Sequence, residues 1–545
     1  MTKKITIKLC FIFLSLLFAY PGQAEENTPV EFESLVGQLS VNSYSKKEAI
    51  IYKIAAIKDS RKVAILQTML DGELYYRKQD KRIIIRKKSA EQYRITDVLN
   101  KKSLGLVDSG AMKKVKVNNK LRRILRGIIA RLSLEDESKK IRLAAVYNIQ
   151  KNINDSGATL LRESLSTEKD EDVREAMITG VALMDVLSED KDTRIKSVAI
   201  LAESVVPLAK SRLEDILEKD DQGQYLESDA RIRALAKKGI DNIESKLSVY
   251  SFLETAFFGL SLGSVLLLIA VGLAITFGVM GVINMAHGEL MMIGAYTTYV
   301  VQLMMPDYID YSLFVAIPLA FVVAGLFGIV IERSVIRFLY GRPLETLLAT
   351  FGISLILQQM VRSIFSPLNR SVATPEWMSG SFEINAAFSL TYNRFYVIIF
   401  SLMVFFFLLA LLKKTSLGLQ VRAVSQNRAM AKAVGVRSEW VDALTFGLGS
   451  GIAGVAGVAL SQLTNVGPNL GQTYIIDSFM VVVFGGVGNL WGTLVSAMSL
   501  GVFNKFLEPW AGAVLAKILV LVLIILFIQK RPRGMFPQKG RAVEN

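Results

Sequence analysis

The chain has 545 residues with a formal net charge of +15, and its charges divide it into two unlike parts. Residues 1–250 hold 45 Lys/Arg and 36 Asp/Glu, whereas residues 251–545 hold 19 and 13, clustered between long apolar runs. This distribution is typical of a water-soluble domain followed by a polytopic membrane domain, and it argues against nucleic acid as the partner. A single His and a single Cys exclude Cys/His metal sites and Cys-His nucleophiles, so we expect no catalytic residues and no metal.

The first 24 residues have the pattern of a cleavable secretory signal. Lys3, Lys4 and Lys8 precede an apolar stretch that ends at Tyr20, and small residues stand before Glu25. We therefore predict a signal peptide over 1–24 and an exported domain over 25–250, which would lie in the periplasm.

The exported domain is predicted to be mostly helical. A short aliphatic-basic pattern returns four times, which predicts degenerate HEAT-like helical repeats, at Ile141–Ala144, Val173–Ala176, Ile195–Val198 and Ile232–Leu235. Between 66 and 118 the pattern changes, and Lys81–Arg86 with Val115–Val117 indicates short strands or an insertion. The basic run Lys113–Arg131 is either a contact for membrane lipid or a solvated face.

Apolar runs in the second part predict a polytopic membrane domain over 251–545 with about eight or nine spans. The predicted crossings are 254–277, 282–303, 312–332, 345–365, 394–412, 440–463, 474–487, 490–504 and 512–529. Nine crossings after an exported domain put the C-terminus in the cytoplasm, on the side that then holds 14 of the 19 cations. The two short segments around Gly485–Asn489 are either full crossings or half-length helices that meet in the bilayer. The predicted fold class is therefore all-α.

A glycine-rich stretch over Gly447–Gly457 lies in the sixth predicted span. Small residues at four-residue spacing let helix backbones approach closely. Close helix packing is the favoured interpretation, and a substrate path is the alternative.

Three segments together carry a family resemblance: Gly272–Tyr296, Ser416–Val436 and Phe484–Thr493. In this order they resemble the permease subunits of branched-chain amino acid-type (LivH-like) ABC importers, over nearly all of 251–540. The resemblance implies a bacterial inner-membrane transport subunit rather than an enzyme, working with a second homologous permease, two ATPases and a periplasmic substrate-binding protein. The chain has no phosphate-binding Gly-x-x-x-x-Gly-Lys-Ser/Thr loop, so ATP and Mg would be used by the ATPases.

The signal and the long exported domain further resemble the urea permease subunits of this family. Urea is therefore the predicted cargo, with branched-chain amino acids or short amides as the alternative. A passive channel or a membrane sensor is the rival from another class, and the segment Ser416–Val436, which resembles the family's ATPase-docking loop, argues against it.

Two groups of residues are singled out. The segment 413–437 resembles the family's ATPase-coupling loop, which nominates Gly418, Arg422, Ala423, Gln426, Asn427, Ala431 and Gly435. Ionisable and amide groups inside spans nominate a substrate path of Asn284, His287, Glu289, Gln358, Gln359 and Asn465. For the first three path residues the alternative is a structural lock on the turn at 281–288; for the last three it is a helix-helix hydrogen bond.

Overall fold

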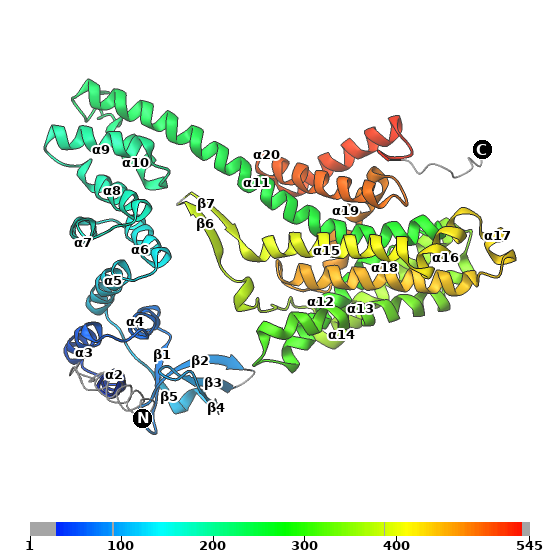
Figure 1. Ribbon diagram of the computed structural model, residues 1–545, viewed down its shortest axis with the longest axis horizontal. Helices are drawn as coiled ribbons and strands as arrows, with labels where there is room; N and C mark the ends of the chain where they lie inside the picture. The colour runs from blue at the N-terminus through cyan, green and yellow to red at the C-terminus, as the bar shows by residue number, and fades with distance from the viewer. Residues whose placement is uncertain (1–28, 90–91, 386, 537–545) are drawn as a thin grey trace, which may run out of the picture. The chain divides into compact units, whose positions relative to one another are not determined.

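The computed structural model describes residues 29–536 apart from 90–91 and 386, and it contains two compact units (Figure 1). The first unit ends at Ile243 and the second begins at Glu244, so the border falls inside one long helix. The sequence places this border at 250. The predicted signal peptide and the cations Lys539 and Arg541 lie outside the described residues.

The first unit is built mainly of short helices that follow one another along the chain. They are α2 (Pro29–Gln38), α3 (Tyr44–Ala56), α4 (Lys62–Asp71), α5 (Asn119–Leu134), α6 (Lys139–Lys151), α7 (Asp155–Leu165), α8 (Glu171–Asp185), α9 (Lys191–Glu203), α10 (Pro207–Ile216) and the start of α11 (Ala230–Met280). Most of them begin at an Asn, Asp or Ser cap, which satisfies the free amides of the first turn.

A five-stranded antiparallel sheet interrupts these helices, so this unit is mostly helical but not all-α. The strands fall within 66–118, where the sequence indicates short strands or an insertion. The order of the sheet is β4-β3-β2-β1-β5, with a short 3-10 turn η1 (Ser109–Ala111) before the last strand, and the strands are β1 (Leu74–Arg77), β2 (Ile83–Ser89), β3 (Gln92–Asp97), β4 (Ser103–Val107) and β5 (Met112–Lys114). The isoleucine run explains the sheet, because β-branched side chains favour strands. Ile83 packs against the helices and Ile84 into a separate cluster with Ile95 and Met112.

Two arginine-centred contacts of the same kind, here called joints, connect later helices of this unit. Arg142 donates from Nη1 to the carbonyls of Asp136 and Glu137, both at 3.0 Å, and from Nε to Glu168 Oε2 at 2.7 Å. Arg194 repeats this geometry with the carbonyls of the residues five and six positions before it and with Glu227. Each glutamate stands two residues before the aspartate that precedes the next helix of the pattern.

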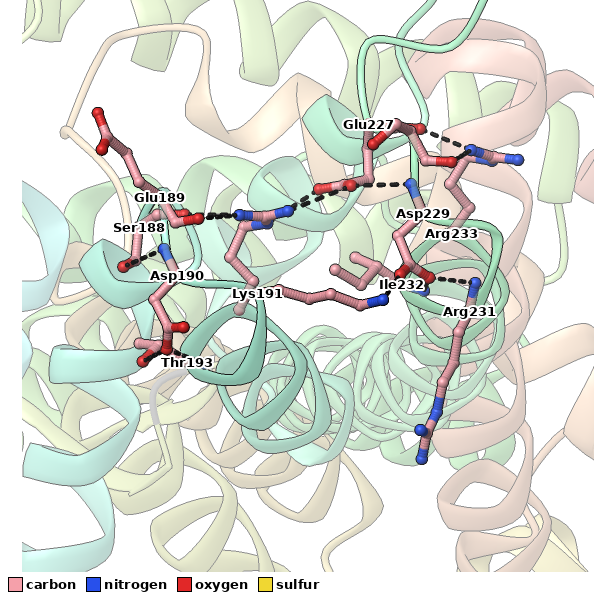
Figure 2. A network of polar contacts seen from close by, with 12 residues as sticks. Ser188, Glu189, Asp190, Lys191, Thr193, Glu227, Asp229, Arg231, Ile232 and Arg233 are labelled. Atoms are coloured by element: carbon pink, nitrogen blue, oxygen red, sulfur yellow. Dashed lines mark hydrogen bonds and ion pairs between the residues drawn. The ribbon is translucent and has the colours of Figure 1, made fainter.

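Figure 2 shows the second of these joints, where Lys191 pairs with Asp229 and the Arg233 guanidinium reaches the backbone of Glu227. Lys139 pairs with Asp170 in the corresponding place of the first joint. The sequence pattern placed its third instance at Ile195–Val198, which is out of register, because the arginine that fills the joint is Arg194. Whether these stacked helices are HEAT-like repeats stays a prediction.

In its described residues, the second unit is helical apart from one two-stranded hairpin. Its elements are the rest of α11, α12 (His287–Met304), α13 (Ile309–Ser334), η2 (Ile336–Leu339), α14 (Pro343–Phe365), η3 (Glu376–Met378), β6 (Ser381–Asn385), β7 (Phe388–Thr391), α15 (Tyr392–Lys414), α16 (Ser416–Gln426), α17 (Arg428–Ala433), α18 (Ser438–Ser461), α19 (Leu470–Gly485) and α20 (Leu490–Lys530). In Figure 1, α12, α13 and α18 pack side by side.

Six described helices are long and apolar enough to cross a membrane: α11, α13, α14, α15, α18 and α20. This count is lower than the eight or nine spans that the sequence predicts, two of which it leaves as possible half-length segments. The second predicted span loses its first residues because α12 begins only at His287, and the seventh corresponds to the shorter apolar helix α19. The eighth and ninth lie in α20, which contains one non-helical residue, Gly512, at φ 75°.

α20 turns back on itself at Gly512. In its first half, Ser496 donates to the carbonyl of Val481 in α19, close to the start of α20 and toward the end of α19. In its second half Lys517 meets Asp477, and Phe527 then meets Phe484, so this half follows α19 in the same direction. The two halves therefore run in opposite directions, as separate eighth and ninth spans would.

The glycines of α18 are packing residues, as the sequence indicated. A Cβ on Gly454 would stand 2.5 Å from the carbonyl oxygen of Ala320 in α13, and one on Gly449 would stand 2.7 Å from that of Gly272 in α11. α18 thus touches both neighbours almost backbone to backbone, which only residues without a side chain allow. It forms the buried centre of the unit.

Contacts define two ends of this unit. At the hairpin end, which carries β6 and β7, Trp377 donates to the carbonyl of Asp310, and Arg370 and Val466 form an isolated bridge. At the loop end, which carries α16 and α17, Val279 packs on the buried cluster around Val421.

Candidate substrate path and coupling surface

The chain between α11 and α12 is an interrupted helix. Gly281 has φ 67°, and residues 281–286 are not helical. Thr350 of α14 holds this segment, because its hydroxyl accepts a hydrogen bond from the amide of Met285 at 3.1 Å. α12 then begins beside α11: the His287 ring lies 3.0 Å from the carbonyl of Ile269. Ile269 is three turns before the end of α11, about 16 Å along its axis.

The start of α12 therefore lies at the middle depth of the helix bundle. Ser354, which contacts this region, is the central residue of α14, and Gly449, which contacts Gly272 beside His287, lies at the centre of α18. Non-helical backbone at this depth occurs in membrane proteins where it is buried in protein or lines a cavity.

Glu289 is the centre of a buried polar group. Its Oε1 accepts hydrogen bonds from Ser354 Oγ at 3.0 Å and from Gln358 Nε2 at 2.8 Å, and the residue is only 1% exposed. Its other oxygen, Oε2, has no hydrogen-bond partner among the described residues. The structure thus brings together two of the nominated path residues and adds Ser354, which the sequence analysis did not single out.

Asn284 and His287 take part in the turn itself. Asn284 Oδ1 accepts from the amide of Ala286 at 3.0 Å, and the His287 ring bonds the backbone of α11. These contacts are those of the structural lock that the sequence left as the alternative. Asn284 Nδ2 and His287 Nδ1 remain without partners in the described part of the chain, although both residues are buried.

α19 begins at the same place as α12. A Cβ on Gly471 would stand 2.5 Å from the carbonyl carbon of Gly288 and 2.7 Å from Oε2 of Glu289. The segment 462–469 before it is non-helical and comes from the hairpin end, where Val466 bridges Arg370. Two helices that enter from opposite ends therefore meet at Gly288 and Gly471.

The other two nominated path residues lie elsewhere. Gln359 follows Gln358 on α14 but is exposed on the outer face of that helix, and Asn465 is exposed in the segment before α19. Neither joins the group around Glu289.

One charged pair inside the predicted spans was missed. Lys517 of α20 lies 2.9 Å from Asp477 of α19, and the Asp477 side chain is 9% exposed. Ionisable residues inside apolar runs are the sequence signal that would have found it, since such residues are rare in spans and pair with one another.

The nominated coupling loop folds as two short helices that share one residue. Asn427 ends α16 and caps α17, where its side chain accepts from the amide of Met430 at 2.9 Å. Arg428 pairs with buried Asp442 of α18 and stacks 3.9 Å from the centroid of the Tyr340 ring. The loop is thus fixed to the helix bundle rather than solvated.

The structure divides the nominated loop residues by exposure. Gly418 and Ala431 are buried and Ala423 is half-buried, whereas the exposed members are Arg422, Gln426, Asn427 and Gly435. Ala431 belongs to the buried cluster with Val421 and Val424, so it supports the loop from inside and is not available to a docking partner. The exposed apolar side chains are instead Leu419 and Met430, each 62% exposed, and Val434, 72% exposed.

The segment Phe484–Thr493, the third part of the family resemblance, forms the turn between α19 and α20 at the loop end. Asn489 caps α20 by accepting from the amide of Gly492 at 3.1 Å, and its Nδ2 donates to the carbonyl of Phe536 at 3.0 Å. Gly486 has φ 103°, and a Cβ there would stand 2.7 Å from the same carbonyl. The motif thus fastens the turn between α19 and α20 to the end of the described chain.

Comparison with known proteins identifies related sequences for the second unit. Residues 255–528 match the family model described as "Branched-chain amino acid transport system / permease component". The chain is 30% identical to the high-affinity branched-chain amino acid transport system permease protein BraD of Pseudomonas aeruginosa over 297 residues, covering 53% of this chain and 96% of that protein.

Two further relatives extend the comparison. LivH of Salmonella typhimurium, a permease protein described in the same words, is 32% identical over 295 residues, covering 52% of this chain and 95% of LivH. The ribose import permease protein RbsC of Haemophilus influenzae is 22% identical over 280 residues, covering 48% of this chain and 81% of RbsC. No solved structure matches the chain.

Proposed function

Because the chain belongs to the family of branched-chain amino acid transport system permease components, we propose that it carries a small solute across the bacterial inner membrane in an ATP-driven importer. It is a multi-pass membrane protein and a transport subunit rather than an enzyme. The proposed assembly pairs it with a second homologous permease, two ATPases that use ATP and Mg, and a periplasmic substrate-binding protein.

The loop end is proposed to face the cytoplasm. Twelve described cations lie near this end: Arg333, Arg337, Arg342, Lys413, Lys414, Arg422, Arg428, Lys432, Arg437, Lys530, Arg531 and Arg533. An excess of Lys and Arg marks cytoplasmic loops. With α11 running from the hairpin end to the loop end, the first unit is then periplasmic.

The fixed coupling loop is the observation that carries the importer mechanism. Met430 and Val434 project from a loop that Arg428 and Asp442 tie to α18, which is the buried centre of the bundle. An ATPase that docks on these side chains would therefore move α18 directly, and α18 touches the helices around Glu289. A passive channel has no need of such a surface.

The cargo is proposed to be a branched-chain amino acid. The relatives that share the whole second unit are described as branched-chain amino acid permeases, and this supports that cargo ahead of urea. Urea remains the second candidate because of one observation: the matched relatives align almost completely, yet the match leaves the first unit uncovered. That unit is the feature by which the sequence resembled urea permeases.

Uptake measurements in cells test this proposal. Cells that supply the partner subunits, with or without this chain, are given labelled leucine or labelled urea. Leucine uptake that depends on the chain and on ATP is expected. Urea uptake that leucine does not inhibit would show that urea, rather than a branched-chain amino acid, is the cargo. Uptake without ATP would favour a passive channel.

A further inference from the structure

The meeting point of α12 and α19 combines two features of opposite electrical character. Both helices begin there, and neither has a side chain that caps its first turn. The amides of His287, Glu289 and Leu470 donate to carbonyls of the preceding turns, but both helix starts keep the partial positive charge of the helix dipole, which attracts anionic groups. The Glu289 carboxyl group lies within the first turn of α12 and beside Gly471, the second residue of α19.

The buried side chains at this point have unused hydrogen-bonding capacity. Glu289 Oε2, His287 Nδ1 and Asn284 Nδ2 have no partner among the described residues, and the three residues are 1%, 0% and 1% exposed. Buried polar atoms without partners cost free energy. Glu289 Oε2 faces Gly471 at the start of α19, so it is the atom with which a ligand at this junction would pair in another state. A purely structural role for Glu289 would satisfy this oxygen within the protein.

We propose that this junction of α12 and α19 is a binding site inside the membrane for the transported amino acid during its passage. The amino acid's carboxylate faces the uncapped starts of α12 and α19, and its ammonium group pairs with Glu289 Oε2. This inference rests on the proposed function, and it adds the site and the chemistry of recognition.

The arrangement suits a zwitterion better than a neutral amide. A charge-assisted hydrogen bond is about twice as strong as a neutral one, so a carboxylate and an ammonium group gain most from paired sites of opposite sign. Sequence alone suggests no such pair, because the positive site is made of backbone amides from two helices far apart in the chain. Gly288 and Gly471 touch in this structure, so occupation requires α12 and α19 to separate.

The test uses the assembled transporter in proteoliposomes, with leucine and two analogues of leucine as probes. Isoamylamine lacks the carboxylate and 4-methylvalerate lacks the ammonium group. Binding to the permease complex is measured without the substrate-binding protein, so that the selectivity of that protein does not enter. The complex is expected to bind leucine at least about tenfold more tightly than either analogue.

Glu289→Gln is the central variant, because it keeps the size and the hydrogen-bonding oxygen but removes the charge. It is expected to weaken leucine binding about tenfold and to leave 4-methylvalerate binding unchanged, so that the two then bind alike. Glu289→Asp should recover part of the preference for leucine. Co-purification with the ATPases serves as the measure of intact assembly.

Two neighbouring residues of α14 provide a control for non-specific effects of a substitution on the fold of the complex. Gln358→Ala removes a contact of Glu289, whereas Gln359→Ala changes the exposed face of the same helix turn, so only the first should alter leucine binding. Equal losses for leucine and 4-methylvalerate in an assembled Glu289→Gln complex would overturn the site. A wild-type complex that binds and transports urea but not leucine would instead overturn the proposed cargo.

Discussion

Gly288 of α12 and Gly471 of α19 touch backbone to backbone at the centre of the membrane unit, where a Cβ on Gly471 would stand 2.5 Å from the carbonyl carbon of Gly288. Because the contact involves backbone atoms on both sides, no rotation of a side chain can relieve a substitution there. The close approach of these helices therefore depends on both glycines.

Gly471→Ala is expected to destabilise the closed junction by about 1–3 kcal/mol through overpacking. Gly352→Ala is the matched control, because that helical glycine has open space around the added Cβ. Thermal unfolding of the purified permease complex and leucine uptake measure the effect. Equal behaviour of the two variants would contradict the importance of the contact.

Val434→Glu should weaken the docking of the ATPase at least about tenfold, since it places a charge in an exposed apolar patch of the coupling loop. Leu368→Glu is the control at the hairpin end, where an apolar side chain is 69% exposed. Co-purified ATPase per permease is the measurement. Loss of ATPase in the control alone would assign docking to the opposite end.

Cysteine labelling tests the orientation of the two ends. The natural chain has a single cysteine, Cys10, so a Cys10→Ser background leaves only the introduced residue reactive. In intact cells stripped of the outer membrane, an impermeant thiol reagent should label Ile384→Cys on the hairpin and should not label Val434→Cys. Labelling of the second variant before lysis would reverse the proposed topology.

The first unit should lose stability in acid through Glu168. Hydrogen bonding from Arg142 holds the pKa of Glu168 below its ordinary value of 4.5, although partial burial opposes this shift. A lowered pKa in the folded state stabilises the unit above the ordinary value, and this contribution is lost as the pH falls through the lowered pKa.

Glu168→Gln therefore should destabilise the joint between α6 and α8 by about 1.5–3 kcal/mol near neutral pH, and by progressively less as the pH falls. The exposed neighbour Glu163→Gln should change little at any pH. Hydrogen exchange of the α6 and α8 amides in the full chain provides the comparison. A difference that does not depend on pH would contradict the role of the ion pair.

Local patterns predicted much of the membrane unit. The spacing of Gly447–Gly457 predicted close helix packing, and the interrupted sequence near Asn284 and Glu289 marked the region where α12 starts. The sequence could not show that α12 begins three turns inside the bundle, because Val282 and Ile283 are as apolar as the helix that follows. It also could not pair Gly288 with Gly471, since that contact depends on how two distant segments fold.

The first unit was predicted less well for physical reasons of the same kind. A run of isoleucines beside lysines indicated strands at 83–86, but the number of strands depends on pairing between segments with weak patterns of their own. The repeat register at Arg194 was missed because the arginine is recognised by a glutamate 33 positions later rather than by its neighbours.

The arginine joints of the first unit have a consequence for how its length can change. Each joint ties the start of one helix to the residues just before a later one, through Arg142 with Glu168 and through Arg194 with Glu227. The segments enclosed by the two joints differ in length, yet the geometry at the joint is the same. The same side-chain contacts therefore close segments of different length, with sequence separations of 26 for Arg142 with Glu168 and 33 for Arg194 with Glu227, so residues can be gained or lost between the two ends of a joint while its contacts are kept.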